Sequence, residues 1–221
     1  MRLVLTKLAY LHASSAVHEN RNPGSFLKFK KNHHIHLDNL YKKVYKSLEK
    51  NLPSFTKLNL KEPELNENHF NCLVHGSVWE PNILFKLQNN SEDELKDVIF
   101  INYHYAYYGS PTIDLQKYIH SIMLENCNEA EKDLVEFYYY KLKDLLQRMV
   151  YKDKIPKFEE FWMQYNHNRV FGLQQILLIN PFVISGKLQS LDVMKGIPSD
   201  DLCDEVFKNQ KVIKYLNSTL V

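Results

Sequence analysis

The sequence predicts a mainly helical protein with a small β-hairpin at its centre, an α+β fold. Three observations predict it. Glycine is scarce, with six in 221 residues, while 14 tyrosines and 12 phenylalanines supply bulky side chains for packing. Apolar residues recur at helical spacing over much of the chain. Only the stretch 72–101 contains short apolar runs separated by a polar segment, which is typical of paired strands.

Helices are expected ahead of this hairpin. The first runs from the N-terminus to about residue 13, where ASSA is expected to end it. The clearest amphipathic helix is LDNLYKKVYKSLEKNL, which begins at residue 37. Its apolar face carries Leu37, Leu40, Val44 and Leu48.

The hairpin itself is expected from three short apolar runs. Strands are predicted at 72–74, 83–85 and 98–101, with the last pairing with the second. The polar segment QNNSEDELKD, residues 88–97, is predicted to form the turn.

More helices are expected after the hairpin. Ser110 and Pro111 are a suitable N-cap and first-turn pair for the first of them. The helices are predicted over residues 112–126, 129–151, 157–179 and 201–217. Three prolines fall between these segments as expected helix breakers: Pro156, Pro181 and Pro198.

Composition excludes several classes of protein. A net charge of +2 without a long basic run gives no signature of a nucleic-acid binder. No stretch approaches the roughly 20 apolar residues that span a bilayer, and Lys7 interrupts the N-terminal apolar run, so neither a membrane protein nor a signal peptide is expected. The three cysteines are far apart, which predicts a reducing, cytoplasmic location rather than disulfides or a zinc site. They are Cys72, Cys127 and Cys203.

The segment HGSVWEPNILF, residues 75–85, has the spacing of a phosphotransferase catalytic loop. Such a loop needs a carboxylate that orients the attacking hydroxyl, an asparagine five positions later that helps to hold Mg²⁺, and a second carboxylate after the returning strand. Asn82 lies five residues after Ser77, and the returning strand ends near Asn102. The frame is therefore present, but Ser77 and Asn102 stand where the two acids are needed.

The run LVHGSVWEPNILF … VIFINYHYAYYGSPTIDL resembles the ecdysteroid kinase-like family, also called choline-kinase-like, which belongs with the aminoglycoside and choline phosphotransferases. The family pattern is HGD-x-W-x-x-N, a strand ending in DFQ, and SP-x-x-DL. LAYLHASSA, residues 8–16, resembles the helix that opens the family's C-terminal lobe. The resemblance thus extends from about the first residue to the last. The matching residues are His75, Gly76, Trp79, Asn82, Ser110, Pro111, Asp114 and Leu115.

The resemblance implies a protein-kinase-like fold, of which residues 1–221 would form a single C-terminal lobe. On this alignment the family's N-terminal nucleotide-binding lobe is expected to be absent, and Lys7, on a predicted helix, is not expected to serve as its phosphate-binding lysine. Active relatives use ATP and Mg²⁺ to phosphorylate hydroxyl groups of small molecules such as steroids. In the family, the residues matching His75 and Asp114 brace the loop, while Gly76 and Trp79 are expected to be structural.

The departures from the family pattern lie at the positions that carry out catalysis in the family. Ser77 replaces the base aspartate, Asn102 replaces the metal aspartate, and His104 replaces a glutamine. With Asn82, the two altered positions form a degenerate site at which no metal is expected to bind tightly and no cofactor is expected. The sequence therefore predicts a catalytically inactive member, a pseudokinase or truncated paralogue.

Other interpretations remain open. The chain could be a fragment of an active kinase that needs a missing lobe, or a non-enzymatic module that binds a small molecule or, on the face bared by that lobe, a protein partner or a second copy. A small-molecule pocket beside the helix around Trp162 is one such possibility. A Ser77–His75–Asp114 hydrolase is disfavoured because the context is not G-x-S-x-G. A histidine-rich stretch is expected to be solvated surface rather than a metal site: His33, His34 and His36.

Overall fold

The computed structural model describes residues 1–29, 35–58, 60–88, 91–122, 128–191 and 198–220. The histidines at 33 and 34, the side chain at 36 and the cysteine at 127 lie outside this description. The chain forms two compact units, which are described separately below. The first comprises residues 1–32, 63–119 and 128–169, and the second comprises 33–62, 120–127 and 170–221.

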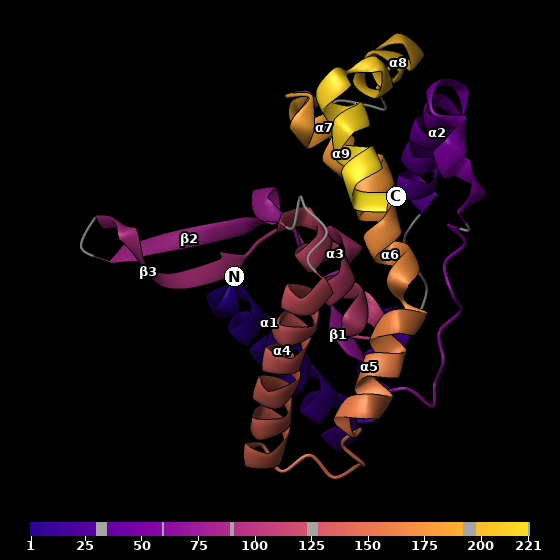
Figure 1. The fold of residues 1–221 in the computed structure, drawn as a ribbon. Coiled ribbons are helices and arrows are strands. Elements are labelled where there is room, and N and C mark those ends of the chain that lie inside the picture. The colour runs from indigo at the N-terminus through magenta and orange to yellow at the C-terminus, as the bar shows by residue number, and fades with distance from the viewer. Residues whose placement is uncertain (30–34, 59, 89–90, 123–127, 192–197, 221) are drawn as a thin grey trace. The chain divides into compact units, whose positions relative to one another are not determined.

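The first unit combines helices with two small antiparallel sheets (Figure 1). Its elements in chain order are α1 (Arg2–Arg21), β1 (Cys72–Val74), β2 (Ile83–Gln88), β3 (Ser91–Phe100), β4 (Tyr107–Gly109), α3 (Thr112–Ile122), α4 (Asn128–Arg148) and α5 (Phe158–His167). Three short 3-10 turns accompany them: η1 (Leu27–Phe29), η3 (Glu80–Asn82) and η4 (Tyr103–Tyr105). This architecture is mainly helical with small sheets, as the sequence predicts.

Helix α1 packs against α4 and against β1. It continues well beyond residue 13, so the expectation that ASSA ends it is wrong. Ala13 and Ala16 are buried in the helix interface, and the Ser15 hydroxyl donates a hydrogen bond to the carbonyl of His12. Because small side chains suit close helix packing and the serine bonds locally, the segment sustains the helix.

The two sheets differ in how well the sequence predicts them. The pairing of β2 with β3 is confirmed, with Ile83 opposite Phe100. However, β3 already begins at Ser91, within the segment expected to form the turn. Strand β4 was not predicted, because three residues in a tyrosine-rich segment give no periodicity to detect. It pairs with β1.

The β2–β3 hairpin has one buried and one exposed apolar face. Ile83, Val98 and Phe100 are buried. On the opposite face, Leu84 and Ile99 lie directly across from each other, with 54% and 58% of their surfaces exposed. An exposed apolar pair of this kind is unusual on a strand, since cross-strand apolar contacts normally support burial.

The second unit is helical. Its elements are α2 (Ile35–Asn51), η2 (Pro53–Lys57), α6 (Arg169–Gln174), the π-helical turn η5 (Gln175–Ile179), α7 (Asn180–Ile184), η6 (Leu188–Leu191), α8 (Asp200–Lys208) and α9 (Gln210–Leu220). Helix α2 has the apolar face that the sequence predicts, and it packs against α8. The buried side chains of this face include Leu40, Val44 and Leu48.

A polar cluster joins α2 to α8. The Asp204 carboxylate accepts hydrogen bonds from the Ser47 hydroxyl at 2.5 Å and the Asn51 amide at 2.9 Å, and it forms an ion pair with Lys50. The hydrogen bond from Lys50, and then that from Ser47, hold the pKa of Asp204 well below its usual range. The carboxylate therefore stays ionised and ties the two helices together.

Two of the predicted long helices are interrupted. The helix expected over 157–179 breaks at Asn168, between α5 and α6, and then widens into the π-helical η5. Pro181 does not separate helices, because it occupies the first turn of α7, where its missing N–H costs nothing. The helix expected over 201–217 breaks at Asn209, whose backbone is extended and whose side chain accepts from the N–H of Lys211.

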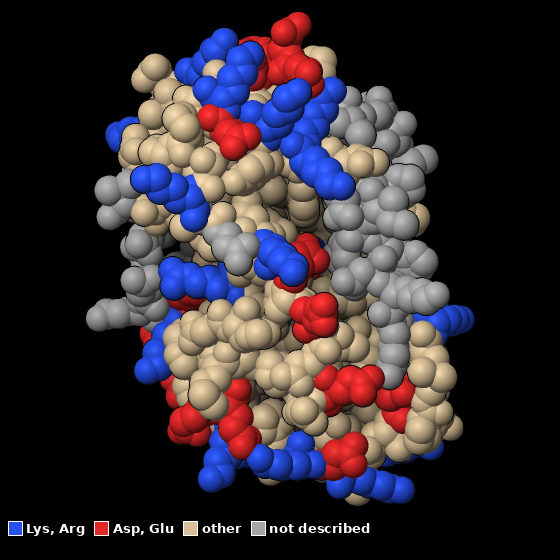
Figure 2. Space-filling model, turned by 90° about the vertical axis from the view of Figure 1, so that its right-hand side faces the viewer, with Lys and Arg blue, Asp and Glu red and all other residues tan. Residues whose placement is uncertain are grey.

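Charges of both signs are mixed over the surface. On the face shown in Figure 2, acidic and basic side chains occur together in both the upper and lower parts of the view. Among the described residues, no helix combines the length and apolar character needed to traverse a bilayer. Cys72 and Cys203 are buried and free of disulfides.

Candidate functional site

The loop between β1 and β2 and the end of β3 form the candidate site, and both belong to the first unit. The Asn82 amide donates hydrogen bonds to the Ser77 carbonyl at 2.9 Å and to the Ser77 hydroxyl at 3.1 Å. The Asn102 amide in turn donates to Asn82 Oδ1 at 3.3 Å. The three residues that the sequence places in the catalytic positions are therefore brought together, and they hydrogen-bond to one another.

Asn102 has a left-handed backbone, with φ 64° and ψ 58°. Most residues with a Cβ are strained in this conformation, but asparagine tolerates it because its short side chain can bond locally. The conformation turns the chain sharply from β3 into η4. Asparagine thus retains the backbone geometry at this position while contributing no charge.

Asp114 is the carboxylate that organises the loop, and it is fully buried at the start of α3. It accepts hydrogen bonds from the backbone N–H of His75 at 2.7 Å and of Gly76 at 2.8 Å. Its Oδ2 also contacts Nε2 of His12 at 3.1 Å. Burial alone would raise the pKa of Asp114, but the hydrogen bond and charge of His12, followed by those of His75, lower it overall. The carboxylate is thus ionised and faces inward.

His75 connects the loop to the end of β3. Its Nε2–H donates to the Ile101 carbonyl at 2.9 Å, which leaves Nδ1 to accept from the backbone N–H of Ser77 at 3.3 Å. Burial lowers the pKa of His75, although the charge of Asp114 opposes this. A neutral ring with its proton on Nε2 satisfies both bonds.

His12 and Tyr138 are site residues that the sequence analysis missed. The Tyr138 hydroxyl lies 2.6 Å from Nδ1 of His12, whose Nε2 contacts Asp114. All three side chains are fully buried, and burial raises the pKa of Tyr138, so its hydroxyl keeps its proton. A histidine four residues after Leu8 on the apolar face of α1 was the available signal.

Gly76 and Lys117 fix the backbone of the loop. Gly76 has φ +78°, and a Cβ on it would lie 2.1 Å from the carbonyl oxygen of Tyr105. Only glycine fits this position. Nζ of the buried Lys117 donates to the Gly76 carbonyl at 2.6 Å. Nothing in the sequence pattern pointed to Lys117, because a lysine on a helix usually faces solvent.

The remaining candidates lie at the edge of the site or outside it. Trp79 is half-buried and precedes η3, whereas its neighbour Val78 is fully buried. His104 is exposed in η4. Trp162 stacks between Phe158 and Tyr165 along α5.

Lys7 lies on α1 and forms an ion pair with Asp97 of β3 at 2.7 Å. Both side chains are 38% exposed. The lysine therefore sits on the helix that the sequence predicts, paired with the hairpin.

Comparison with known protein families identifies the relationship. The model of the ecdysteroid kinase-like family matches residues 1–151, which include the loop, the hairpin and α3. The chain belongs to the ecdysteroid kinase-like family. It is therefore a relative of kinase-like small-molecule phosphotransferases. A search against curated proteins gave no match.

The geometry of this family member limits the chemistry of the loop. Among the described residues, no three His, Cys, Asp or Glu side chains are grouped as metal ligands would be. A hydrolytic mechanism also lacks its essential contact, because the ring nitrogens of His75 bond to backbone groups rather than to the Ser77 hydroxyl. The loop thus has an organised backbone, with neutral side chains at positions 77, 82 and 102.

Replacing Asp114 by asparagine should destabilise the protein strongly. The Asp114→Asn variant turns one acceptor oxygen into an NH₂ group that faces buried donors, so we expect a loss of about 2–4 kcal/mol in the free energy of unfolding. Urea denaturation followed by circular dichroism measures it. The matched control is Asp144→Asn on α4, whose side chain is 60% exposed and pairs with Arg148, and it should leave the midpoint nearly unchanged. Equal losses of stability in the two variants would contradict the conclusion that Asp114 holds the loop in place.

Replacing Gly76 by alanine should cost far more than the same change at Gly186. Both residues have positive φ, but a Cβ at Gly186 meets no atom within 4 Å. Gly186→Ala should therefore cost only the backbone strain, about 1 kcal/mol. Gly76→Ala adds the clash with Tyr105, so we expect a loss of more than about 3 kcal/mol. Thermal and urea unfolding compare them, and similar losses would refute the close approach.

Stability should decrease as the pH falls from 7 to 5.5. Burial holds the folded-state pKa of His75 below the ordinary histidine value, so the unfolded chain binds more protons over this range and folding loses free energy. The His75→Gln variant should lose less stability over this range. Part of the loss should remain, because burial also lowers the pKa of His69. His104→Gln, at an exposed histidine nearby, should retain the wild-type slope. Urea midpoints at several pH values provide the measurement, and an unchanged slope in His75→Gln would rule out a neutral, buried ring.

Proposed function

We propose that this chain is a catalytically inactive, kinase-like member of its family that acts by binding rather than by phosphoryl transfer. The observation that carries the proposal is the hydrogen-bonded set of Ser77, Asn82 and Asn102, which contains no carboxylate. The Asp114 carboxylate, at the start of α3, is fully buried and occupied by backbone donors of the loop.

The loss of the base position removes one part of the chemistry. A positioned general base contributes roughly 10²–10⁴ in rate. The Ser77 hydroxyl accepts a hydrogen bond from Asn82, and a serine hydroxyl is too weak a base to take a proton from an acceptor alcohol at neutral pH. Phosphoryl transfer would therefore lack the group that orients and deprotonates its nucleophile.

The loss of the metal position removes the other part. Mg²⁺ is a hard cation that is usually held by one or two carboxylates together with phosphate oxygens. Asn82 and Asn102 provide neutral amides, and Asn82 Oδ1 is already taken by the Asn102 amide. These residues do not fit a magnesium–nucleotide complex, so we derive no catalytic step through ATP or Mg²⁺.

A binding role finds support in the exposed face of the β2–β3 hairpin. Leu84 and Ile99 form an exposed apolar pair there. Exposed apolar patches of several hundred Å² on a protein surface mark interaction sites. An inactive family member could retain such a surface for contact with another molecule.

The proposal predicts that this chain neither transfers phosphate nor binds a divalent metal at the loop. Incubation with radiolabelled ATP, Mg²⁺ and a panel of steroid and amino-alcohol acceptors should give no transfer above a protein-free control. Titration with Mn²⁺, followed by electron paramagnetic resonance, should show no saturable site up to about 1 mM.

Restoring the two acids provides the matched comparison. Ser77→Asp combined with Asn102→Asp should create a saturable Mn²⁺ site, because two carboxylates would then flank Asn82. Ser54→Asp combined with Asn166→Asp adds the same charge at exposed positions outside the loop and should not. Phosphate transfer or tight Mn²⁺ binding by the wild type would overturn the proposal. Failure of the restored variant to bind Mn²⁺ would refute its electrostatic explanation.

A further inference from the structure

A polar cavity lies at the opposite end of β1 from the catalytic loop. Its volume is about 840 Å³, within the range of small-molecule sites. It is lined by the segment 66–71 that precedes β1, by Tyr108 of β4, by the connection 151–156 and by one side of α5, all in the first unit. Trp162 is not among the lining residues, so this is not the pocket expected around that side chain.

The charge of the lining favours a cation. Lys154 contributes the lysine of the lining, and its Nζ is held by the Glu160 carboxylate at 2.6 Å. The Asp153 carboxylate accepts from the neutral Asn20 amide, and within the described part of the chain no ion pair is recorded for it. Glu67 adds a third carboxylate to the lining. The lining therefore carries more negative than positive charge.

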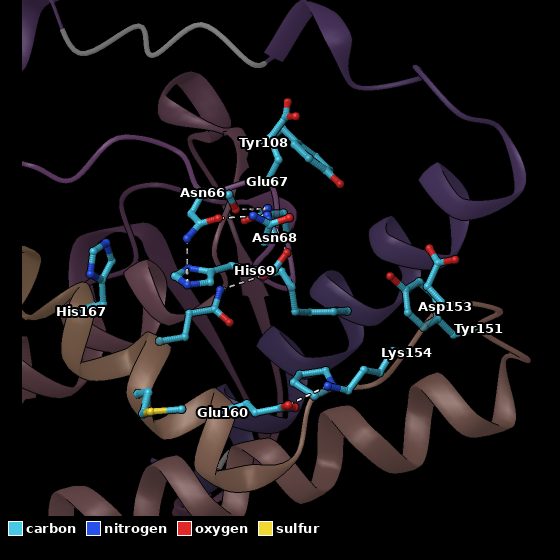
Figure 3. A pocket seen from close by; sticks show the side chains of 15 residues that line it. Asn66, Glu67, Asn68, His69, Tyr108, Tyr151, Asp153, Lys154, Glu160 and His167 are labelled. Carbon is cyan, nitrogen blue, oxygen red and sulfur yellow. Dashed lines mark hydrogen bonds and ion pairs between the residues drawn. The ribbon is translucent and has the colours of Figure 1, made fainter.

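Aromatic side chains line the cavity together with the Asp153 carboxylate. Figure 3 shows Tyr151 and Asp153 side by side, with the ring of Tyr108 directed toward them. Phe70 meets Tyr151 edge to face, with ring centroids 5.9 Å apart. Burial, and then the Asp153 carboxylate, raise the pKa of Tyr151 to about 12, so the ring is neutral. Neutral aromatic faces next to a carboxylate attract organic cations.

Hydrogen bonds within the segment 66–71 fix one wall of the cavity. The Asn71 amide donates to the carbonyls of Asn66 and His69, while its Oδ1 is buried without a hydrogen-bond partner. Nε2 of His69 accepts from the Asn66 side chain.

We propose that this cavity binds an organic ammonium ion whose charged head is held by Asp153 and by the rings of Tyr108 and Tyr151. An apolar body fits the rest of the cavity, where Phe70 and Met163 contribute apolar surface. An anionic ligand would meet the Asp153 carboxylate, for which the described residues provide no ion pair, and a neutral ligand would leave it without a countercharge. This site does not depend on the catalytic loop or on its loss of activity.

Three probes of the same size test the proposal with the full wild-type chain. They are phenethylamine, which is protonated at pH 7, the neutral 2-phenylethanol and the anionic phenylacetate. In ¹H–¹⁵N NMR titrations at low ionic strength, the amine should shift amide resonances of 66–71 and 151–156 saturably. It should bind at least roughly fivefold more tightly than the alcohol, as expected for a partly screened charge pair. Phenylacetate should bind more weakly still.

Two variants assign the effect to the cavity. Asp153→Asn keeps an acceptor for Asn20 but removes the charge, and it should weaken amine binding roughly fivefold while leaving the alcohol unaffected. Asp144→Asn on α4, outside the lining, should have no effect. The proposal is overturned if the alcohol or the acid binds as tightly as the amine, if Asp153→Asn binds the amine as the wild type does, or if no saturable shift occurs up to about 10 mM. The wild-type comparison decides even if a variant does not fold.

Discussion

The carboxylate of Asp114 is the constraint on which the first unit depends. One side chain satisfies two consecutive backbone N–H groups of the loop and meets a histidine from α1. The helix that opens the chain, the loop after β1 and the start of α3 are thereby joined at one buried point. Buried charge is costly unless it is fully compensated, and here donors surround it. The loop keeps a defined shape because its anchor lies inside the protein.

The residues that fix the backbone of the loop are different from those at its catalytic positions. The residues that shape the backbone are buried and bonded: Gly76, His75 and Asp114. By contrast, Ser77 is only half-buried and Asn102 is exposed. Exchange of an exposed acid for a neutral side chain costs a folded protein little, whereas loss of a buried acid breaks several bonds at once. The buried residues can therefore hold the shape of the loop whichever side chains stand at positions 77 and 102.

Patterns in the sequence predicted those elements that form from interactions between residues close together in the chain. The amphipathic face of α2 follows from the spacing of Leu40, Val44 and Leu48, and the pairing of β2 with β3 follows from two apolar runs around a polar segment. What the sequence did not reveal depends on tertiary contact. The length of α1 reflects packing of Ala13 and Ala16 against neighbouring elements, and β4 forms because β1 offers it an edge.

The candidate site likewise contains residues that sequence motifs predict and residues that only tertiary contacts reveal. Family motifs located Ser77, Asn82 and Asn102, and the structure brings these residues together. His12 and Tyr138 escaped notice because their significance lies in a contact across 126 positions of the chain. The cavity at the other end of β1 had no motif at all, since its lining comes from four separate segments.

The left-handed backbone at Asn102 has an evolutionary consequence. Aspartate and asparagine are almost the same size, and both tolerate this conformation, so exchange between them needs no adjustment of the main chain. Lineages could thus pass from a metal-binding residue to a neutral one, or back again, by a single isosteric replacement. Because this turn favours asparagine or aspartate at position 102, one substitution is enough to restore the acid there. A bulkier residue at this position would not fit the turn.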